Sequence, residues 1–233
     1  MRLNNKDLYD FFVEKNIHKL YHANTVSTSS TFLQNIGLMS RGTVEKMNLY
    51  QTNQSSDFKD KQVNVWDDIF LDTADLHKHF KRGNLYGPVL FELNNELLLN
   101  EEFEIWITKD NPLYWNIVMN NEERYFVSVE ELRDKWDSID RQKKMITIRN
   151  ANSPILFEYV NKVVVDDPNV IINEIGGKKQ NVFITAQNKL KQNVSENHIL
   201  KNKFFTREKC GYCFCTYNYL HQNSSDQLKK LFF

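Results

Sequence analysis

The segment Lys19-Leu-Tyr-His-Ala-Asn-Thr25 predicts a short strand that ends at a histidine, His22. An amphipathic segment follows and leads to Gly37-Leu-Met-Ser-Arg41, so we expect a helix between the two. In this arrangement His22, Thr25 and Arg41 would line one polar pocket. The alternative is that His22 is a hydrogen-bonded structural residue, which is the commoner role for a histidine after an apolar pair. The rest of the sequence has to decide between the two interpretations.

Length and composition predict a soluble protein with one substantial core. The chain has 233 residues and 41% apolar side chains, enough for one domain or for one domain with an appendage. No run of eighteen apolar residues occurs, and the first thirty residues lack the basic start and apolar block of an export signal. We therefore expect a cytoplasmic protein with no membrane partner.

Charge is distributed unevenly along the chain. The formal net charge is zero, but residues 176–233 hold ten Lys and Arg against three Asp and Glu, a net of +7, which leaves −7 for residues 1–175. We therefore divide the chain into a first domain, residues 1–175, and a basic C-terminal appendage, residues 176–233. Aromatic residues interleaved with the basic ones are typical of surfaces that bind single-stranded nucleic acid. The alternative is a solvated basic face over a small aromatic core. The aromatic residues are Phe183, Phe204, Phe205, Tyr212, Phe214, Tyr217 and Tyr219.

Two groups of residues have the chemistry of metal ligands. Cys210, Cys213 and Cys215 stand close together and would bind zinc if His198 or His221 supplied the fourth ligand. Structural zinc sites usually have two separated ligand pairs, so we favour reduced, buried thiols over zinc and expect no metal. The second group contains Asp72, Asp75, His77 and His79.

Apolar periodicity and capping residues predict mixed helices and strands. In the first half we expect a helix at 4–16, a strand at 18–22, a helix capped within 27–30 and ended by Gly37, a long polar loop at 43–64 and a strand or short helix at 64–77. In the second half we expect strands at 87–93, 103–108, 145–149 and 162–166, helical segments at 94–99, 115–120 and 129–137, a turn or short helix at 155–160, and a basic helix from about 186. This order lacks regular strand-helix-strand alternation and favours an α+β fold.

Six segments carry a resemblance to a known family when they are taken in order. They are Leu20-Tyr-His-Ala-Asn-Thr25, Gly37-Leu-Met-Ser40, Gly87-Pro-Val-Leu-Phe-Glu-Leu-Asn-Asn-Glu-Leu-Leu-Leu, Trp106-Ile-Thr-Lys-Asp-Asn-Pro, Arg141-Gln-x-x-Met-Ile-Thr and Val160-Asn-Lys-Val-Val-Val. Over residues 18–168 the chain resembles the DarT-type ADP-ribosyltransferases, bacterial toxins and phage-defence enzymes that transfer ADP-ribose from NAD to nucleic acid. The resemblance implies a split central β-sheet flanked by helices, NAD as substrate and an antitoxin protein as partner, with a chaperone as a further candidate partner.

The resemblance also implies roles for individual residues. His22 would hydrogen-bond a ribose hydroxyl of NAD, and Thr25 or the backbone beside it would anchor the nicotinamide amide. Arg41 would bind the pyrophosphate, because a guanidinium bonds phosphate oxygens in pairs. Tyr21 or Tyr86 would pack on the nicotinamide ring. The implied set of NAD-contacting residues is Tyr21, His22, Thr25, Ser40, Arg41 and Tyr86.

The catalytic carboxylate is the point at which this chain departs from the family. Displacement at the anomeric carbon develops positive charge in the ribose, and a nearby carboxylate stabilises it. The resemblance places a Glu just before the strand at Met145, where this chain reads Asp140-Arg-Gln-Lys-Lys-Met145. We interpret Asp140, the acid nearest that strand, as the catalytic carboxylate acting with Arg41. The alternatives are Glu130 or Glu131 in its place, use of Gln142, or an inactive site.

The acceptor is expected to be RNA or single-stranded DNA. Lys143, Lys144 and Arg149 lie beside the expected catalytic strand and would contact the nucleic acid, or they are ordinary surface residues. Two other functions remain open. One is a catalytically inactive nucleic-acid-binding module, and the other is a metal-dependent nuclease that uses Asp72, Asp75 and His77.

Overall fold

Four strands form the main sheet of the computed structural model, which describes residues 2–79, 86–173, 179–207 and 215–233. The order is β1 (Lys19–Asn24), β4 (Val89–Asn94), β8 (Val160–Val165) and β11 (Phe204–Thr206). The first three strands run antiparallel to their neighbours, and β11 runs parallel to β8. Because β1 lies at an edge of this sheet, the polar residues at its end are available to a neighbouring element.

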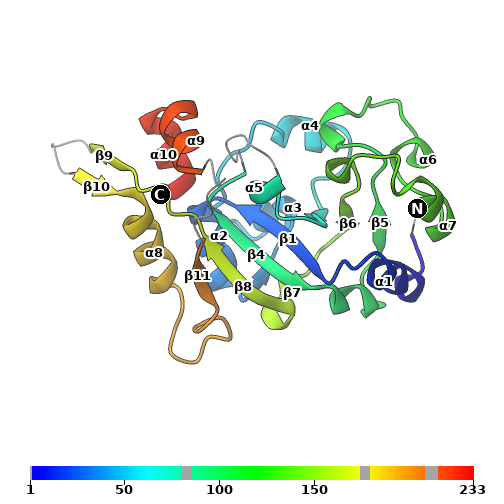
Figure 1. The fold of residues 1–233 in the computed structure, drawn as a ribbon, viewed down its shortest axis with the longest axis horizontal. Helices are drawn as coiled ribbons and strands as arrows, with labels where there is room; N and C mark the ends of the chain where they lie inside the picture. Colours follow the sequence, from blue (N-terminus) through cyan, green and yellow to red (C-terminus); the bar gives the residue numbers. More distant parts are fainter. Residues whose placement is uncertain (1, 80–85, 174–178, 208–214) are drawn as a thin grey trace.

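A second sheet of three strands is joined to the main sheet at one point. Its order is β3 (Ile69–Leu71), β6 (Ile146–Ile148) and β5 (Ile105–Ile107), with antiparallel neighbours. Tyr21 on β1 and Asp72, directly after β3, form an isolated bridge in which each N–H donates to the other's carbonyl oxygen, at 2.9 and 2.8 Å. The strands therefore form a sheet that is split in two at the edge of β1 (Figure 1).

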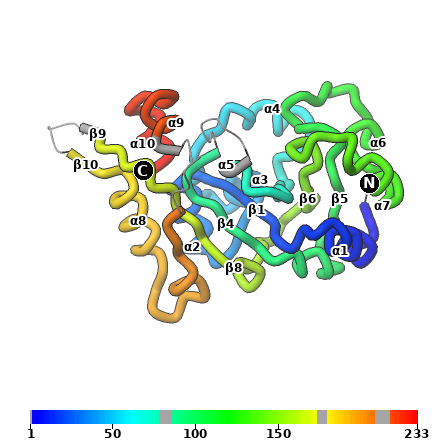
Figure 2. Tube along the Cα trace, viewed as in Figure 1, coloured from blue at the N-terminus to red at the C-terminus, as the bar shows by residue number. Residues whose placement is uncertain are grey.

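Helix α2 (Val26–Gln34) covers one face of the main sheet beside β1. All residues from Val26 to Leu33 are buried, and the ring of Phe32 lies 6.2 Å from that of Phe91 on β4. Helices α8 (Val182–Gln192) and α10 (Ser225–Phe232) pack on α2, and α9 (Cys215–Gln222) lies near α10. The C-terminal helices thus gather at one end of the molecule, and α1 (Asn5–Glu14) and α7 (Val129–Lys135) lie at the other (Figures 1 and 2).

Short elements complete the described chain. The helices are α3 (Arg41–Lys46), α4 (Asp57–Gln62), α5 (Leu76–His79), α6 (Asn121–Arg124), η1 (Asn95–Leu99), η2 (Pro112–Tyr114), η3 (Arg141–Lys143) and η4 (Phe157–Tyr159). Two further strand pairs are β2 (Gly37–Leu38) with β7 (Ile155–Leu156), and β9 (Ile171–Asn173) with β10 (Lys179–Asn181). No helix in the described ranges is long and apolar enough to cross a membrane.

The α+β class expected from the sequence is confirmed, whereas three local predictions are wrong. Residues 43–64 are not one long loop, because they contain most of α3 and all of α4. The helix expected at 115–120 is absent. The helix in this region is α6, which begins after Asn120, because Asn120 and Glu123 form a capping box that fixes its start. Helix α2 begins earlier than expected, at Val26, because Thr25, and not a residue of 27–30, accepts from a main-chain N–H as its N-cap.

The C-terminal segment contributes to the same sheet as the first part of the chain. Strand β11 pairs with β8, and Arg207 directly after it donates to the carboxylate of Asp166 through Nε at 2.5 Å. Tyr219 on α9 donates to the other oxygen of Asp166 at 2.7 Å, and both partners are buried. The division at residues 175 and 176 remains a proposal, and these contacts cross it.

Candidate functional site

His22 links the two sheets through its side chain. It lies on β1 opposite Phe91, and its Nδ1 is 2.9 Å from the main-chain oxygen of Phe70 on β3. A carbonyl oxygen only accepts, so Nδ1 carries the proton and donates. The ring lies 6.0 Å from that of Phe32 on α2. The strand was expected to end at His22, but β1 continues to Asn24, because Ala23 and Asn24 also pair with β4. His22 nevertheless lies at the split between the sheets.

The other ring nitrogen of His22 is a buried acceptor. Burial lowers the pKa of His22, so the ring is neutral near pH 7 and Nε2 holds a lone pair. This atom is buried and has no hydrogen-bond partner among the residues that the structure describes. Buried polar atoms are nearly always satisfied, and those that are not often mark a ligand or water site. Nε2 of His22 therefore suits a ligand that donates a hydrogen bond, such as a hydroxyl group.

Thr25 and Arg41 belong to one polar cluster, which also contains Gln51, Thr52 and Asp57. The hydroxyls of Thr25 and Thr52 are 2.7 Å apart. Arg41 donates through Nη2 to the main-chain oxygen of Thr52 at 3.1 Å and to Oδ2 of Asp57 at 2.7 Å. We call these five residues the Arg41 cluster. The structure thus brings together two of the residues that the sequence placed in one pocket.

Several polar atoms of the Arg41 cluster lack a partner. Nε of Arg41, Oε1 of Gln51 and Oδ1 of Asp57 are buried, and none has a hydrogen-bond partner in the described part of the chain. A guanidinium with a free Nε suits a second anionic group, and Asp57 already occupies its other edge. A pyrophosphate bound to this Nε would lie close to the carboxylate of Asp57, and the two negative charges would repel each other.

Ser40 and Thr25 both have structural duties. Each caps a helix by accepting from a main-chain N–H, Ser40 from Thr43 and Thr25 from Thr28. Ser40 is 1% exposed and Thr25 is fully buried. The hydroxyl of Ser40 therefore stabilises the start of α3, and the hydroxyl of Thr25 stabilises the start of α2. For the second helix the sequence pattern predicts a cap within residues 27–30 instead. Direct contact of either hydroxyl with NAD remains a proposal.

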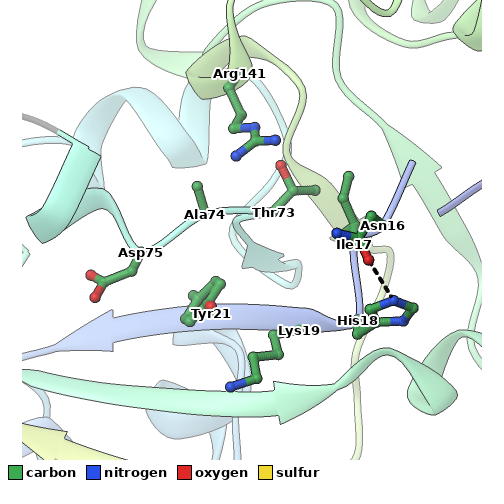
Figure 3. Close-up of a pocket in the computed structure, with 9 residues that line it drawn as sticks. All are labelled: Asn16, Ile17, His18, Lys19, Tyr21, Thr73, Ala74, Asp75 and Arg141. Carbon is green, nitrogen blue, oxygen red and sulfur yellow. Dashed lines mark hydrogen bonds between the residues drawn. The ribbon is translucent and has the colours of Figure 1, made fainter. Parts of the chain in front are cut away.

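Tyr21 faces away from His22. Consecutive side chains on a strand point to opposite faces, so the two residues do not share a pocket. Tyr21 lines a hollow of about 540 Å³ with Lys19, Thr73, Asp75 and Arg141, which we call the Tyr21 hollow (Figure 3). Burial, with Glu92 and Asp75 nearby, raises the pKa of Tyr21 to about 12, so the phenol is neutral.

Tyr86 stands at the entry to β4. It is 46% exposed, so its ring is accessible from solvent. The next residue, Gly87, has φ +139°, and a Cβ there would lie 2.2 Å from the carbonyl group of Asn24. Only glycine fits this close approach of β4 to the end of β1. Tyr86 thus enters β4 beside the end of β1, and its packing on nicotinamide remains a proposal.

Asp140 lies in a second hollow, next to the first. It is exposed, it precedes η3, and its hollow of about 670 Å³ also contains Lys143, Lys144 and Arg141. We call this the Asp140 hollow. Arg141 lines both hollows, so they adjoin. His22 lines neither, and the structure therefore does not place Asp140 and His22 in one pocket.

The alternative carboxylates differ in how they are held. Glu131 binds Lys109 at 2.8 Å and Lys135 at 2.7 Å, and these contacts outweigh burial and lower its pKa to about 2. Glu130 lies exposed in the first turn of α7. Neither residue lines the Tyr21 or the Asp140 hollow. Their position gives no support to a catalytic role.

Asp72 is a carboxylate that sequence reasoning considered only as a metal ligand. Its main chain pairs with Tyr21, the residue before His22. Burial raises the pKa of Asp72 to about 7. A carboxyl group with such a pKa is able to accept and donate a proton near neutral pH. The sequence does not reveal that Asp72 lies beside Tyr21, because this neighbourhood depends on the pairing of β1 with the residue after β3.

The three basic residues beside β6 have different surroundings. Arg149 donates to Asp68 at 2.9 Å and to the Tyr125 hydroxyl at 2.7 Å, with its guanidinium 5.0 Å from the Trp106 ring. Lys144 is 4% exposed, and its Nζ donates to the main-chain oxygens of Trp136 and Ile139. Arg149 and Lys144 are thus engaged inside the protein. Lys143 is 44% exposed in its side chain and pairs with Asp110 at 3.2 Å.

The candidate metal ligands do not assemble into a site in the described residues. Asp75 pairs with Arg207 at 2.5 Å, and His77 pairs with Asp166 at 2.8 Å. Within the part of the chain that the structure describes, no three His, Cys, Asp or Glu residues are grouped to hold a metal ion. Cys210 and Cys213 lie outside the described residues, and Cys215 is the first residue of α9.

Comparisons with known proteins yield one structural match to report. No family model matches the sequence, and no curated protein matches it. Among solved structures the chain is similar to Thermus sp. 2.9 DarT in complex with ADP-ribosylated ssDNA, with a TM-score of 0.45 and 9% sequence identity. The match covers 64% of this chain and 82% of that chain. A similarity of this size does not assign the chain to a family.

Proposed function

We propose that this protein transfers ADP-ribose from NAD to a single-stranded nucleic acid, RNA or DNA. The order of the sequence motifs supports the proposal, and the observation that carries it is the buried, unpartnered Nε2 of His22 at the split between the sheets. A ribose hydroxyl is a donor of the kind this nitrogen accepts. Arg41, Gln51 and Asp57 add unpartnered polar atoms in the Arg41 cluster, which includes Thr25, three residues after His22.

In the proposed reaction the bond between nicotinamide and the anomeric carbon breaks, and a bond to the acceptor forms. Nicotinamide leaves with the bonding electron pair, and the acceptor gives up a proton. Asp140 is the proposed carboxylate that stabilises the positive charge in the ribose, and Arg41 the proposed pyrophosphate ligand. Asp72 is the rival carboxylate, because its strand pairing places it beside Tyr21 and the sheet junction.

Calorimetric titration with NAD tests the role of His22. Replacement His22→Leu removes the acceptor and should raise the Kd for NAD about tenfold, the value of one to two hydrogen bonds. His221→Leu is the matched control, because His221 is an exposed histidine on α9. Absence of NAD binding by the unmodified protein, or equal affinity in both variants, would contradict the proposal.

The second candidate function is a catalytically inactive nucleic-acid-binding module. One observation favours it: residues 141–145, directly before β6, contain no acid, and Lys144 in this segment is buried. This candidate predicts oligonucleotide binding without any transfer from NAD. The structure does not favour a metal-dependent nuclease, because Asp75 pairs with Arg207 and His77 pairs with Asp166.

A role as a toxin restrained by an antitoxin protein completes the proposal. Expression of the unmodified protein in bacteria should stop growth, and expression of His22→Leu should not. A chaperone requirement would appear as recovery of soluble protein only with the partner present. Growth that is equally inhibited by both forms would contradict a toxin role based on ADP-ribosyl transfer.

A further inference from the structure

The Tyr21 hollow and the Asp140 hollow share one lining residue, Arg141, and therefore adjoin. Their volumes are about 540 and 670 Å³, each in the range of a pocket for a small organic ligand. None of the roles proposed above uses Arg141, Thr73 or Lys19. Asp140 is the proposed catalytic carboxylate, so the Asp140 hollow adjoins the proposed place of transfer, whereas NAD binding at His22 leaves the Tyr21 hollow unexplained.

Two polar side chains in the Tyr21 hollow, Thr73 and Arg141, lack a hydrogen-bond or ion-pair partner among the described residues. Thr73 is 6% exposed, and its buried Oγ1 has no hydrogen-bond partner among the described residues. Arg141 makes no ion pair with any residue in the described ranges, and its guanidinium points into the hollow toward Thr73 (Figure 3). A hydroxyl beside a free guanidinium is suited to an anion such as a phosphate.

Most of the charges around Arg141 are offset by neighbouring residues. Asp75 lines the same hollow, but Nη1 of Arg207 lies 2.5 Å from its Oδ2 and offsets its charge. Lys19 pairs with Glu92 at 3.0 Å.

The Asp140 hollow adds Lys143, which is partly offset by Asp110. It also adds two acids: Asp137 pairs with Lys15 at 3.3 Å, and Asp140 is exposed, so that solvent screens its charge. Arg141 and Lys144 both lack an ion pair among the described residues, but Lys144 is 4% exposed and its Nζ is bonded to main-chain oxygens. Arg141 is therefore the cation that remains available to a ligand.

Tyr21 supplies an aromatic ring on the wall of the same hollow. The ring is partly exposed and lies below Arg141 in the close-up view (Figure 3). Aromatic rings that stack on bases, combined with cations that contact the backbone, are the usual elements of single-strand binding. The Tyr21 hollow offers an aromatic ring, that of Tyr21, and a cation, Arg141.

We infer that the two adjoining hollows bind a single-stranded nucleic acid, with one base stacked on Tyr21 and its phosphate at Arg141 and Thr73. The inference rests on the proposed function for the class of ligand. The bound nucleotide is one that flanks the modified nucleotide, because Tyr21 and His22 lie on opposite faces of β1. The site thus sets the affinity for the strand.

Fluorescence anisotropy with labelled single-stranded DNA and RNA oligonucleotides tests the inference without NAD. Tyr21→Leu should weaken binding about five- to a hundredfold, and Tyr21→Phe, which keeps the ring, should restore it. Tyr114→Leu is the matched control, since Tyr114 is 73% exposed on η2. Equal binding by Tyr21→Leu and the unmodified protein would overturn the stacking role.

The phosphate contact has its own readout in the salt dependence. Arg141→Gln should weaken binding about fivefold or more and reduce the slope of log affinity against log salt by about 0.7, the value of one phosphate on a single strand. Arg133→Gln is the control, because Arg133 on α7 pairs with Glu14 away from both hollows. An unchanged slope in Arg141→Gln would overturn the inference.

NAD separates this inference from the proposed function. Calorimetry with NAD should give the same affinity for Arg141→Gln as for the unmodified protein, and NAD should not displace the oligonucleotide. Competition by NAD would assign the Tyr21 hollow to NAD and overturn the inference. A protein that fails to bind NAD but needs Tyr21 and Arg141 for the oligonucleotide would contradict the proposed function alone.

Discussion

His22 on β1 donates through Nδ1 to the main-chain oxygen of Phe70 on β3, 2.9 Å away, and so connects the two sheets with a side chain. The same bond fixes the tautomer of the ring, because the proton on Nδ1 leaves Nε2 as the acceptor. Nδ1 of His22 thus has a structural role, while Nε2 remains available to accept a hydrogen bond from a ligand. The structural and the ligand-binding interpretations of His22 are therefore compatible.

Removal of the Asp57 carboxylate should strengthen NAD binding. In the structure Asp57 bonds the guanidinium of Arg41 at 2.7 Å, so its negative charge would oppose a pyrophosphate bound to the same guanidinium. We expect Asp57→Asn to lower the Kd for NAD about three- to tenfold in a calorimetric titration. Asp134→Asn, at an exposed position on α7, is the control. Weaker NAD binding by Asp57→Asn would show that Arg41 does not bind the pyrophosphate.

Asp72 should make stability depend on pH between about 4 and 7. Burial raises its pKa in the folded protein to about 7, above the value of about 3.9 for an unfolded chain. The folded state then binds the proton more tightly, so this contribution is present at low pH and is lost as the pH rises through 7.

The substitution Asp72→Asn removes this dependence. We expect the variant to be more stable than the unmodified protein at pH 8, by about 1–3 kcal/mol in urea unfolding, with little difference at pH 4. The stability gain should vanish gradually across the window. If the two proteins lose stability in parallel between pH 4 and pH 8, Asp72 does not hold a raised pKa.

Arg149 should matter for folding and not for nucleic-acid binding. It pairs with Asp68, whose side chain is 1% exposed, and lies against Trp106 and Tyr125. Arg149→Met leaves Asp68 buried without its partner and should cost about 3–5 kcal/mol of unfolding free energy.

The double variant Asp68→Asn with Arg149→Met is the control for that cost. Removal of both charges should recover most of the lost stability, because no unpaired charge remains buried. The affinity of the folded fraction for an oligonucleotide should stay unchanged in both variants. If a fully folded variant bound the oligonucleotide more weakly, Arg149 would contact the nucleic acid, as expected from the sequence.

Local patterns in the sequence predicted the elements that local contacts determine. The helix after Ser128 and the strand before Thr25 follow from a cap and from alternation, and both are present. The partners of the site residues come from far along the chain. His22 and Phe70 are 48 residues apart, and Arg149 and Asp68 are 81 residues apart. Two pairings are needed to see this: that of β3 with β6 brings Arg149 to Asp68, and that of Tyr21 with Asp72 brings Asp72 to the junction.

The catalytic carboxylate is open to a direct comparison of two variants. Asp140→Asn should reduce the rate of ADP-ribosyl transfer about a hundredfold or more while the Kd for NAD stays the same. Asp72→Asn serves as the comparison, because it removes the rival carboxylate. A larger loss of rate in Asp72→Asn than in Asp140→Asn would identify Asp72, and not Asp140, as the catalytic carboxylate.

Transfer itself is the most direct test of the central claim. The unmodified protein, His22→Leu and His221→Leu are each incubated with NAD and single-stranded DNA or RNA, and the oligonucleotide mass is measured by mass spectrometry. We predict the added mass of one ADP-ribosyl group with the unmodified protein and with His221→Leu, and a loss of about tenfold or more in rate with His22→Leu. An oligonucleotide of unchanged mass in every reaction, with the protein folded and binding it, would contradict the account.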